Sequence, residues 1–298
     1  MAANRIPRGV SHCGVPKLVI FGDPRKGRVA EAIAEFAEFV KGKAEVVAEC
    51  GIDRCTTGML KEADFAVVFG GDGSITSAAR QLSETGVPVI GVNLGRLGYL
   101  AEFSVRELND FFSDIVRGKA RIEKRMMLHC GVFGGGKEKF SSPAINDVFI
   151  MAGPPFKMIE LKVSVDGQPL AGCVSDGLVI STPTGSTAYN LSAGGPIIAG
   201  SVQAMVITPL NPHSLSFRPI VISADSKIEV VGVNVNEGTT VSVDGQESCR
   251  LAADEVVEIK RHKGDFLVVH NPLRTQWDTL AEKLGWAEKP KYNSTEGV

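Results

Sequence analysis

The sequence predicts an α/β N-terminal domain followed by a mainly β C-terminal domain. In the first part, strand-length apolar runs alternate with helical patterns, which is typical of a doubly wound parallel sheet. After about residue 122, short strand-like stretches follow one another, and Asp-Gly pairs mark turns between them. A length of 298 residues also suits about two domains.

The first part gives the clearest element signals. The run Phe65–Phe69 is uniformly apolar, as expected of a strand that is covered on both faces. Val29, Ile33, Phe36 and Val40 have the spacing of one helix face. The pattern predicts a Rossmann-like sheet, with ligands at the carboxyl ends of its strands. We expect strands at 17–21, 44–48, 65–69 and 88–92, and helices over 29–40, 74–82 and 105–116.

The second part is predicted to be β-rich, with hairpins at Asp166-Gly167 and Asp244-Gly245. A final helix is expected where Leu273, Trp277, Leu280 and Leu284 recur, with Gly285 as its cap and a frayed polar end at 289–298. No low-complexity linker separates the two parts, so they should share a tight interface. The expected strands are 161–165, 177–181, 204–208, 227–233, 240–243 and 255–259.

Composition excludes several classes of protein. The net charge of -2 argues against a nucleic-acid-binding protein. No apolar run reaches the ~20 residues that a membrane span needs, and the N-terminus has no secretory pattern. The six cysteines form no C-x-x-C pair, so we expect reduced thiols in a cytoplasmic protein. Cysteines and histidines also lack the spacing of a structural zinc site.

A glycine-rich loop follows the strand at 65–69 and precedes a helix. It consists of Gly70, Gly71, Asp72, Gly73 and Ser74. Glycines let backbone N–H groups approach a phosphate, and a helix N-terminus favours an anion. Asp72 is therefore a candidate base or orienting group for an attacking hydroxyl. By itself, the loop is equally compatible with an aspartate that only caps the helix.

Two further loops contain candidate ligand contacts. The segment 93–100 resembles a strand-to-helix turn filled by Leu97 and Leu100, and shapes a cleft at most. The segment 175–196 has six hydroxyl side chains between Ser181 and Ser192, and an aromatic ring at Tyr189. It contains no positive charge, so it suits a ribose and a nucleobase better than a bare phosphate. The alternative is a Ser/Thr-rich surface turn.

Shorter features favour structural roles when each is taken alone. Asn146-Asp147 resembles a turn pair that could bind a sugar hydroxyl, and Gln246 follows a hairpin tip. His213 and Arg218 could reach phosphate, although such side chains more often satisfy local carbonyls. The run 134–137 looks like a P-loop fragment, but it lies between two strand-like runs and is predicted to be a hairpin turn.

Taken together, these segments resemble the NAD kinase family. The motifs are GGDGS at 70–74, NLGRLGYL at 93–100, ND at 146–147, SDGLVISTPTGSTAYNLSAGGP at 175–196, PHSLSFRP at 212–219 and DGQ at 244–246. They occur in the family's order, and the resemblance extends from about residue 17 to 286. GGDG alone is shared with phosphofructokinases and lipid kinases, whereas TPTGSTAY is highly specific.

The resemblance implies phosphorylation by ATP of the 2'-hydroxyl of the adenosine ribose of NAD, giving NADP, with a divalent cation, expected to be Mg2+, whose ligands are unknown. It also implies that the last helix returns to the first domain. The domains expected are 1–122, with the GGDGS loop; 123–270, which binds NAD; and 271–298, the final helix and tail. By analogy with the family, the chain should be a cytoplasmic homodimer or homotetramer without nucleic-acid or membrane partners.

Site roles carry over from the family's motifs residue by residue. Asp72 is the expected base, and Gly70, Gly71, Gly73 and Ser74 form the phosphate loop. The expected NAD contacts are Asp72, Gly73, Asn146, Asp147, Lys157, Asp176, Thr187, Ala188, Tyr189, Ser192 and Gln246. Lys157 has no firm motif behind it. Asp147 replaces the family's usual Glu, which shortens its reach by roughly 1.3–1.5 Å.

Two alternatives remain at this level. A lipid or sugar kinase could share the GGDG loop alone, although the hydroxyl-rich segment argues against it. A non-catalytic dinucleotide sensor would bind NAD without consuming ATP, and the presence of every expected chemical group disfavours it. The sequence does not distinguish NAD from NADH as substrate, or ATP from polyphosphate as donor.

Overall fold

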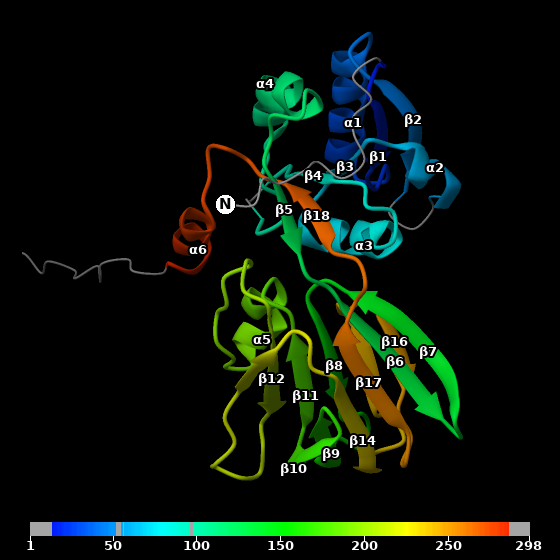
Figure 1. The fold of residues 1–298 in the computed structure, drawn as a ribbon, viewed down its shortest axis with the longest axis vertical. Coiled ribbons are helices and arrows are strands. Elements are labelled where there is room, and N and C mark those ends of the chain that lie inside the picture. Colours follow the sequence, from blue (N-terminus) through cyan, green and yellow to red (C-terminus); the bar gives the residue numbers. More distant parts are fainter. Residues whose placement is uncertain (1–13, 52–54, 56, 96–97, 286–298) are drawn as a thin grey trace, which may run out of the picture.

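The computed structural model describes residues 14–51, 55, 57–95 and 98–285. Figure 1 shows an α/β layer above a β-sandwich, as the sequence predicts. Cys13, Arg96, Leu97 and the expected frayed end at 289–298 lie outside the described residues. Among the described residues, no helix combines the length and apolarity that crossing a bilayer requires.

The first sheet has six strands in the order β2-β1-β3-β4-β18-β5. Its first five strands run parallel, and β5 pairs antiparallel with β18. In the sequence, β5 precedes the strands of the sandwich and β18 follows them. Both fall at the ends of the expected second domain, 123–270, but they pair in the first sheet. The strands are β1 (Lys17–Phe21), β2 (Glu45–Cys50), β3 (Phe65–Phe69), β4 (Val89–Val92), β5 (Ile122–Arg125) and β18 (Phe266–Val269).

Helices cover both faces of this sheet, which makes it doubly wound. Alternate residues of each central strand enter different cores: Ile20 packs with α1 and α4, and Phe21 with α2 and α3. The helix α4 begins with a capping box in which Ser104 and Glu107 exchange hydrogen bonds. The helices are α1 (Gly27–Val40), α2 (Thr57–Glu62), α3 (Asp72–Leu82) and α4 (Val105–Val116).

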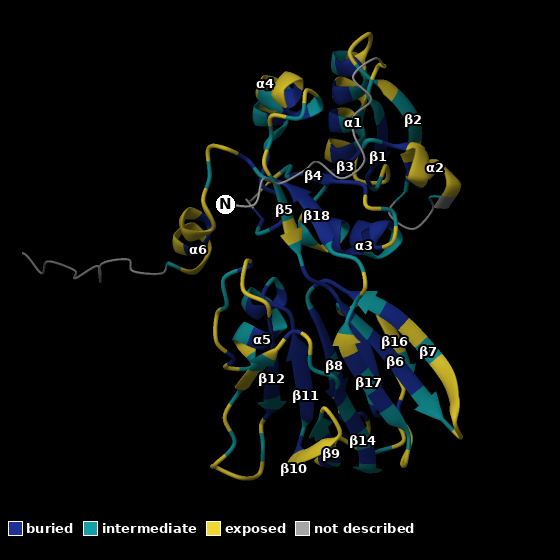
Figure 2. Cartoon of the chain, in the orientation of Figure 1, coloured by how far each residue is buried: buried dark blue, intermediate teal, exposed yellow. Residues whose placement is uncertain are grey.

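Two six-stranded antiparallel sheets form the sandwich, ordered β10-β9-β14-β17-β6-β7 and β13-β12-β11-β8-β15-β16. Their apolar faces share one core, and Figure 2 shows buried residues along the central strands. The strands are β6 (Leu128–Gly134), β7 (Lys137–Ala144), β8 (Asp147–Met151), β9 (Ile159–Val165), β10 (Gln168–Ser175), β11 (Gly177–Ser181), β12 (Ala204–Leu210), β13 (Ile220–Ser223), β14 (Ile228–Asn234), β15 (Thr240–Val243), β16 (Glu247–Arg250) and β17 (Val256–Arg261).

The three predicted hairpin turns are confirmed. Asp166-Gly167 connects β9 with β10, Asp244-Gly245 connects β15 with β16, and Gly135-Gly136 connects β6 with β7. Both named residues of each turn have positive φ. The loops at 166–167 and 135–136 have two residues, which this geometry favours, whereas the loop between β15 and β16 has a third residue, Gln246. The P-loop-like run at 134–137 is therefore a β-turn.

The final helix α6 (Gln276–Leu284) lies beside the first domain (Figure 1), as expected from the resemblance. Its approach is fixed by Asn271, which bonds to buried Glu102, and by Arg274, which pairs with Glu107. Gly285 ends the helix in the left-handed conformation, as predicted. Of the apolar residues that predict this helix, only Leu280 is buried, and Trp277 is 59% exposed.

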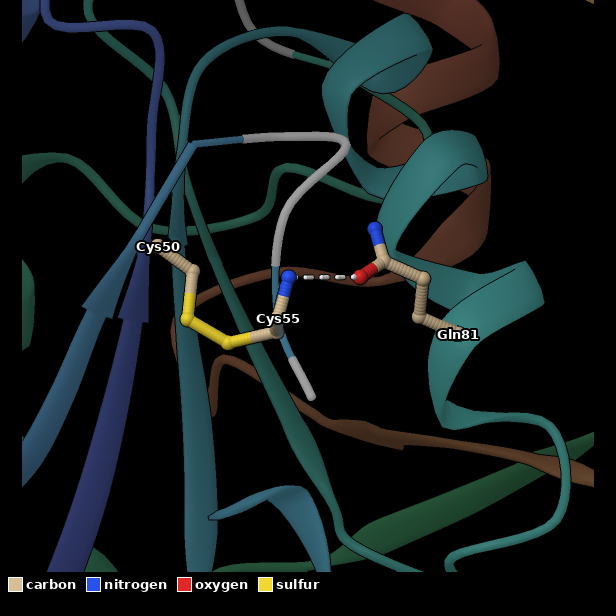
Figure 3. Close-up of a disulfide and its surroundings, with 3 residues drawn as sticks. All are labelled: Cys50, Cys55 and Gln81. Carbon is tan, nitrogen blue, oxygen red and sulfur yellow. Dashed lines mark hydrogen bonds between the residues drawn. A yellow bond between two sulfur atoms is a disulfide. The ribbon is translucent and has the colours of Figure 1, made fainter. Parts of the chain in front are cut away.

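The prediction that all cysteines are reduced is wrong for one pair. Cys50 at the end of β2 and Cys55 ahead of α2 form a disulfide (Figure 3). Their Cα atoms lie 5.4 Å apart, within the range that a disulfide bridges. The backbone N–H of Cys55 also donates to the side-chain oxygen of Gln81 on α3. Cys130, Cys173 and Cys249 are free thiols.

Candidate active site

Asp72 is the first residue of α3 and lies at the carboxyl edge of the parallel sheet. The chain leaves β3 through Gly70, whose φ of +150° and closeness to Ser74 leave no room for a side chain. Gly71 then caps α3, and the N–H groups of Ser74 and Ile75 bond to its carbonyl oxygen. The expected loop of Gly70, Gly71, Gly73 and Ser74 therefore begins a helix beside the Asp72 carboxylate.

Four donors surround the Asp72 carboxylate. Oδ2 accepts hydrogen bonds from the Tyr99 backbone N–H at 3.0 Å and from Lys283 Nζ at 3.2 Å. Oδ1 accepts from the backbone N–H groups of Leu100 at 3.0 Å and Ala101 at 3.3 Å. The segment 93–100, expected only to shape a cleft, thus binds the proposed catalytic carboxylate directly.

These contacts determine the charge of Asp72. Burial alone would raise its pKa, but the N–H groups of Leu100 and Tyr99 and the ammonium group of Lys283 outweigh burial and lower it. Gly98 is required beside it, because a Cβ at that position would lie 2.1 Å from Asp72 Oδ1. Asp72 is therefore ionised at neutral pH in a pocket shaped to its carboxylate.

The second domain holds the Asn146-Asp147 pair in place through a residue that the sequence analysis overlooked. The Asp244 carboxylate accepts hydrogen bonds from the backbone N–H groups of Ile145, Asn146 and Asp147, at 2.8 to 3.1 Å. Asp244 stands at the hairpin tip with positive φ, which directs its side chain at the start of β8. The Asp-Gly turn signal identified the turn but not this contact.

Asp147 itself is buried, with 3% of its surface exposed. Burial and the neighbouring Asp244 carboxylate raise its pKa to about 7, although the Tyr189 backbone N–H opposes this shift. A carboxyl group with this pKa is partly protonated at neutral pH and can donate or accept a hydrogen bond.

The hydroxyl-rich segment is folded inward rather than forming a surface turn. Ser181, Thr182 and Ser186 are fully buried, and their hydroxyl groups donate to backbone carbonyls of 145–198. They therefore support the loop. The hydroxyl-bearing side chains of this segment that line cavities are Thr184, Thr187, Tyr189 and Ser192. They come from the 3-10 turn at Gly185–Thr187, the residue before it and the short helix α5 (Tyr189–Ser192). Ala188 links these two turns.

Three cavities are lined by five of the candidate residues. One of about 760 Å³ contains Asp72 with Gly95, Gly98, Tyr99 and α6 residues 282–284. A second, of about 420 Å³, is lined by Asp176, Tyr189 and Ser192. The third, about 130 Å³, contains Thr187 together with Tyr99 and Trp277. Tyr99 and α6 therefore border both the Asp72 cavity and the Thr187 cavity, whereas these described cavities keep Asp72 apart from Tyr189.

Several other candidates have structural partners. The Gln246 amide donates to Gly73 O at 3.0 Å and Thr76 Oγ1 at 2.6 Å, and its oxygen accepts from Ser77 and Arg80. Lys157 is exposed, and its carbonyl oxygen accepts from Asn236. Arg218 donates to the carbonyls of Leu215 and Phe217, as the local alternative predicts.

Sequence reasoning did not identify Tyr99, Lys283 or Asp244 as parts of the site. Lys283 lies 211 residues from Asp72 in sequence. Its signal was weak: one basic residue in the last turn of a helix is ordinarily explained by the helix dipole.

Comparisons with known proteins agree with this architecture. Residues 33–120 match the ATP-NAD kinase N-terminal domain, and residues 145–271 match the ATP-NAD kinase C-terminal domain. The NAD kinase of Rhodopirellula baltica is 37% identical over 276 residues, covering 92% of this chain and 88% of that protein. The NAD kinase of Geotalea daltonii is 36% identical, covering 92% of this chain and 99% of that protein.

Two solved structures have the same fold. Yeast NADH kinase complexed with NADH superposes with a TM-score of 0.84 at 25% identity, covering 94% of this chain and 90% of that one. An NAD kinase from Archaeoglobus fulgidus in complex with ATP gives a TM-score of 0.71 at 24% identity, covering 91% of this chain and 98% of that one.

Proposed function

The chain belongs to the NAD kinase family, and we propose that it transfers the terminal phosphoryl group of ATP to the 2'-hydroxyl of the adenosine ribose of NAD. In this reaction the ribose oxygen forms a bond to the γ-phosphorus, and the bond from that phosphorus to the β-γ bridging oxygen breaks. ADP leaves, and the hydroxyl proton passes to the Asp72 carboxylate. The product is NADP.

The ionised carboxylate of Asp72 is the observation that carries this proposal. A general base must be unprotonated at working pH and must face the space in which its substrate binds. Backbone N–H groups and Lys283 keep Asp72 charged, and its side chain, 31% exposed, borders the cavity of about 760 Å³. Its place beside the N-terminus of α3 suits a reaction between phosphates and a hydroxyl.

The dinucleotide is proposed to lie across both domains. Asp176, Tyr189 and Ser192 share one cavity, which supports their role in binding one part of NAD. Thr187 and Ala188 adjoin it. Asn146, Asp147 and Gly73 are proposed contacts near the ribose, whereas Lys157 and Gln246 would have to bind NAD in addition to their present partners. The relative from yeast is described with NADH, which supports a dinucleotide site in this fold.

We assign no residue as a ligand of the divalent cation. Within the described residues, no group of three or more Asp, Glu, His or Cys side chains could form a metal cage. Magnesium in phosphoryl transfer is usually bound by substrate phosphates, water and one or two carboxylates, and when bound it neutralises phosphate charge. Within 70–74, the backbone N–H groups of Gly71, Asp72 and Gly73 would bind the phosphates. Those of Gly70 and Ser74 already donate to the carbonyl oxygens of Val92 and Gly71.

Replacing Asp72 by Asn tests the proposal. We expect kcat for ATP-dependent NADP formation to fall about 10²- to 10⁴-fold, because general-base catalysis is lost. Circular dichroism and thermal melting would report the fold. Asp114→Asn is the matched control, because Asp114 also pairs with a lysine, Lys119, but on an exposed part of α4 and the turn after it. A folded D72N enzyme with near wild-type kcat would exclude Asp72 as the base.

We also propose a cytoplasmic homodimer or homotetramer, in line with the family. Large apolar side chains exposed on the sandwich support an assembly: Phe156 is 73% exposed, Leu215 90% and Val221 50%. Light scattering of wild-type protein and of a Phe156→Ser/Leu215→Ser variant would test this, since the variant should shift towards a monomer.

A further inference from the structure

The acceptor positions of Asp72 are filled in this structure. A carboxylate offers about four lone-pair positions, two on each oxygen. Tyr99 N–H and Lys283 Nζ take Oδ2, and the N–H groups of Leu100 and Ala101 take Oδ1. A sugar hydroxyl that is to deliver its proton to Asp72 therefore needs one of these four donors to leave.

Three of the donors cannot leave easily. They are consecutive backbone N–H groups, and Leu100 and Ala101 are buried in the core between the sheet and α3. The carbonyl oxygen of Ala101 also accepts from the Gly98 N–H. Moving this segment away from Asp72 would expose apolar side chains and leave buried N–H groups without partners.

Lys283 is different, because its donor is at the end of a flexible side chain. The residue belongs to the last turn of α6, a helix with only Thr279 and Leu280 buried. Its side chain is 28% exposed, and it borders the same cavity as Asp72. Among the described residues, the ammonium group has one further contact, with the Tyr99 ring at 4.6 Å, so it can change partner without disturbing the core.

The cavity also determines which partner would replace the carboxylate. Lys283 Nζ lies in a space of about 760 Å³ that is bordered by Gly95 and Gly98. Asp72, at the N-terminus of α3, lines this space as well, so a phosphate entering it would meet both the helix dipole and the ammonium group. Phosphate binds an ammonium group through charge-assisted hydrogen bonds.

We propose that Lys283 exchanges partners during the reaction: it occupies an acceptor position on Asp72 in the free enzyme, and moves to a phosphate of ATP when the nucleotide binds. The inference rests on the proposed role of Asp72 as base. The exchange opens Oδ2 to the ribose hydroxyl at the moment when the donor phosphate has arrived. Lys283 thus makes acceptance of the proton conditional on ATP.

A double-mutant cycle on ATP binding tests the exchange. Calorimetry would give Kd for ATP with Mg2+ in the wild type, Asp72→Asn, Lys283→Met and the double variant. In D72N the ammonium group is released from a carboxylate, so we expect binding to tighten about 10-fold. In the K283M background the same Asp72 change should tighten binding less than about 3-fold, because only charge repulsion is removed.

Matched variants separate this exchange from a general effect of charge. Lys119 and Asp114 form an exposed pair at 3.0 Å, so K119M, D114N and their double variant should leave Kd for ATP unchanged. Lys283→Arg retains a cation and should keep Kd within about threefold of wild type. If K283M fails to fold, Lys283→Gln replaces it in the cycle, because glutamine also lacks the cation. An equal gain from D72N in both lysine backgrounds would overturn the proposal.

The cycle also distinguishes failure of this inference from failure of the proposed function. It measures binding and requires no turnover. If D72N retained normal kcat, Asp72 would not be the base. The exchange could then not open Asp72 to the ribose hydroxyl, even if the cycle showed that Asp72 and Lys283 are coupled in ATP binding. If D72N lost activity and the cycle showed no coupling, Asp72 would remain the base and the role of Lys283 would be wrong.

Discussion

Asp72 in the first domain and Asp147 in the second are both largely enclosed, yet their charges differ. The pKa of Asp72 is lowered because N–H donors and Lys283 outweigh its burial. Burial and the Asp244 carboxylate raise the pKa of Asp147 to about 7. One site therefore contains a carboxylate at neutral pH, and the other contains a group close to half-protonated. Asp72 can therefore only accept a proton or a hydrogen bond, whereas Asp147 can also donate one.

Asp244 shows which cause matters most. Like Asp72, it accepts hydrogen bonds from three consecutive backbone N–H groups. Its pKa is nevertheless raised, because deep burial exceeds the effect of those donors and of the more distant Arg80. Asp72 differs in being less buried and in having a lysine at 3.2 Å. Partial exposure and a close cation, rather than N–H donors alone, keep a carboxylate in this fold charged.

The largest of the following effects is expected when the Asp72 carboxylate is displaced while the aspartate itself is kept. A methyl group at Gly98 would overlap Asp72 Oδ1, so Gly98→Ala must displace the carboxylate from its donors. We expect kcat to fall about 10²-fold, as for other small displacements of catalytic groups. Steady-state NADP formation measures it. Gly27→Ala on α1 is the control, because a Cβ there meets no atom within 4 Å. Equal rates for the two variants would contradict the proposed geometry.

The next effect is on stability, and it concerns Asp147. A folded-state pKa of about 7, above the ordinary aspartate value of 3.8, means that between these two pH values the folded protein holds a proton that the unfolded chain has lost. Wild-type stability should therefore fall as pH rises from about 4 to 7. Asp147→Asn removes this loss. We expect the free energy of unfolding of D147N, relative to that of wild type, to increase by about 2–4 kcal/mol as pH rises from 4 to 8.

Urea unfolding at several pH values would measure this difference. Asp225→Asn is the control, because Asp225 is exposed on the surface of the sandwich and should give no such trend. A constant difference between D147N and wild type across this pH range would show that Asp147 is ionised throughout.

The smallest effect has the opposite sign and belongs to Asp72. Its folded-state pKa lies below the unfolded value, so its ionised form stabilises the fold above about pH 4 and loses this contribution as pH falls through the folded pKa. At pH 7, D72N should be less stable than wild type by about 1 kcal/mol, since the group is partly exposed. The gap should close in acid. Urea unfolding of wild type and D72N at pH 7 and pH 3 would measure this difference in stability. A difference that is larger at pH 3 than at pH 7 would contradict the prediction.

Many of the elements could be predicted because they have local signals, whereas the short helix α2 and the strands β5, β13 and β18 were not expected. The apolar run Phe65–Phe69, the helix face from Val29 to Val40 and the three hairpin turns all lie where expected. The pairing of a strand from the end of the chain with strands of the first part had no such local signal. The strand β18, near the end of the chain, joins the first sheet between β4 and β5, and nothing in its four residues indicates that partner.

The site could be predicted only where its residues form motifs. Asp72 and Tyr189 lie in contiguous motifs, whereas Lys283 and Asp244 act through contacts distant in sequence. The disulfide was missed for a related reason. Spacing alone does not reveal that the end of β2 and the start of α2 bring Cys50 and Cys55 together. The proposed ligand roles of Asn146, Asp176, Thr187, Ala188 and Ser192 remain predictions.

Gln246 has a consequence for the alignment of the two halves. Its single amide uses two donors and two acceptor positions, and all four go to α3, the helix that begins with Asp72. A side chain from the β-rich half therefore fixes the distance and tilt of the helix on which the proposed phosphate loop depends. Phosphoryl transfer requires the two reactants to meet in line. The accuracy of that meeting therefore depends on how this one amide holds α3.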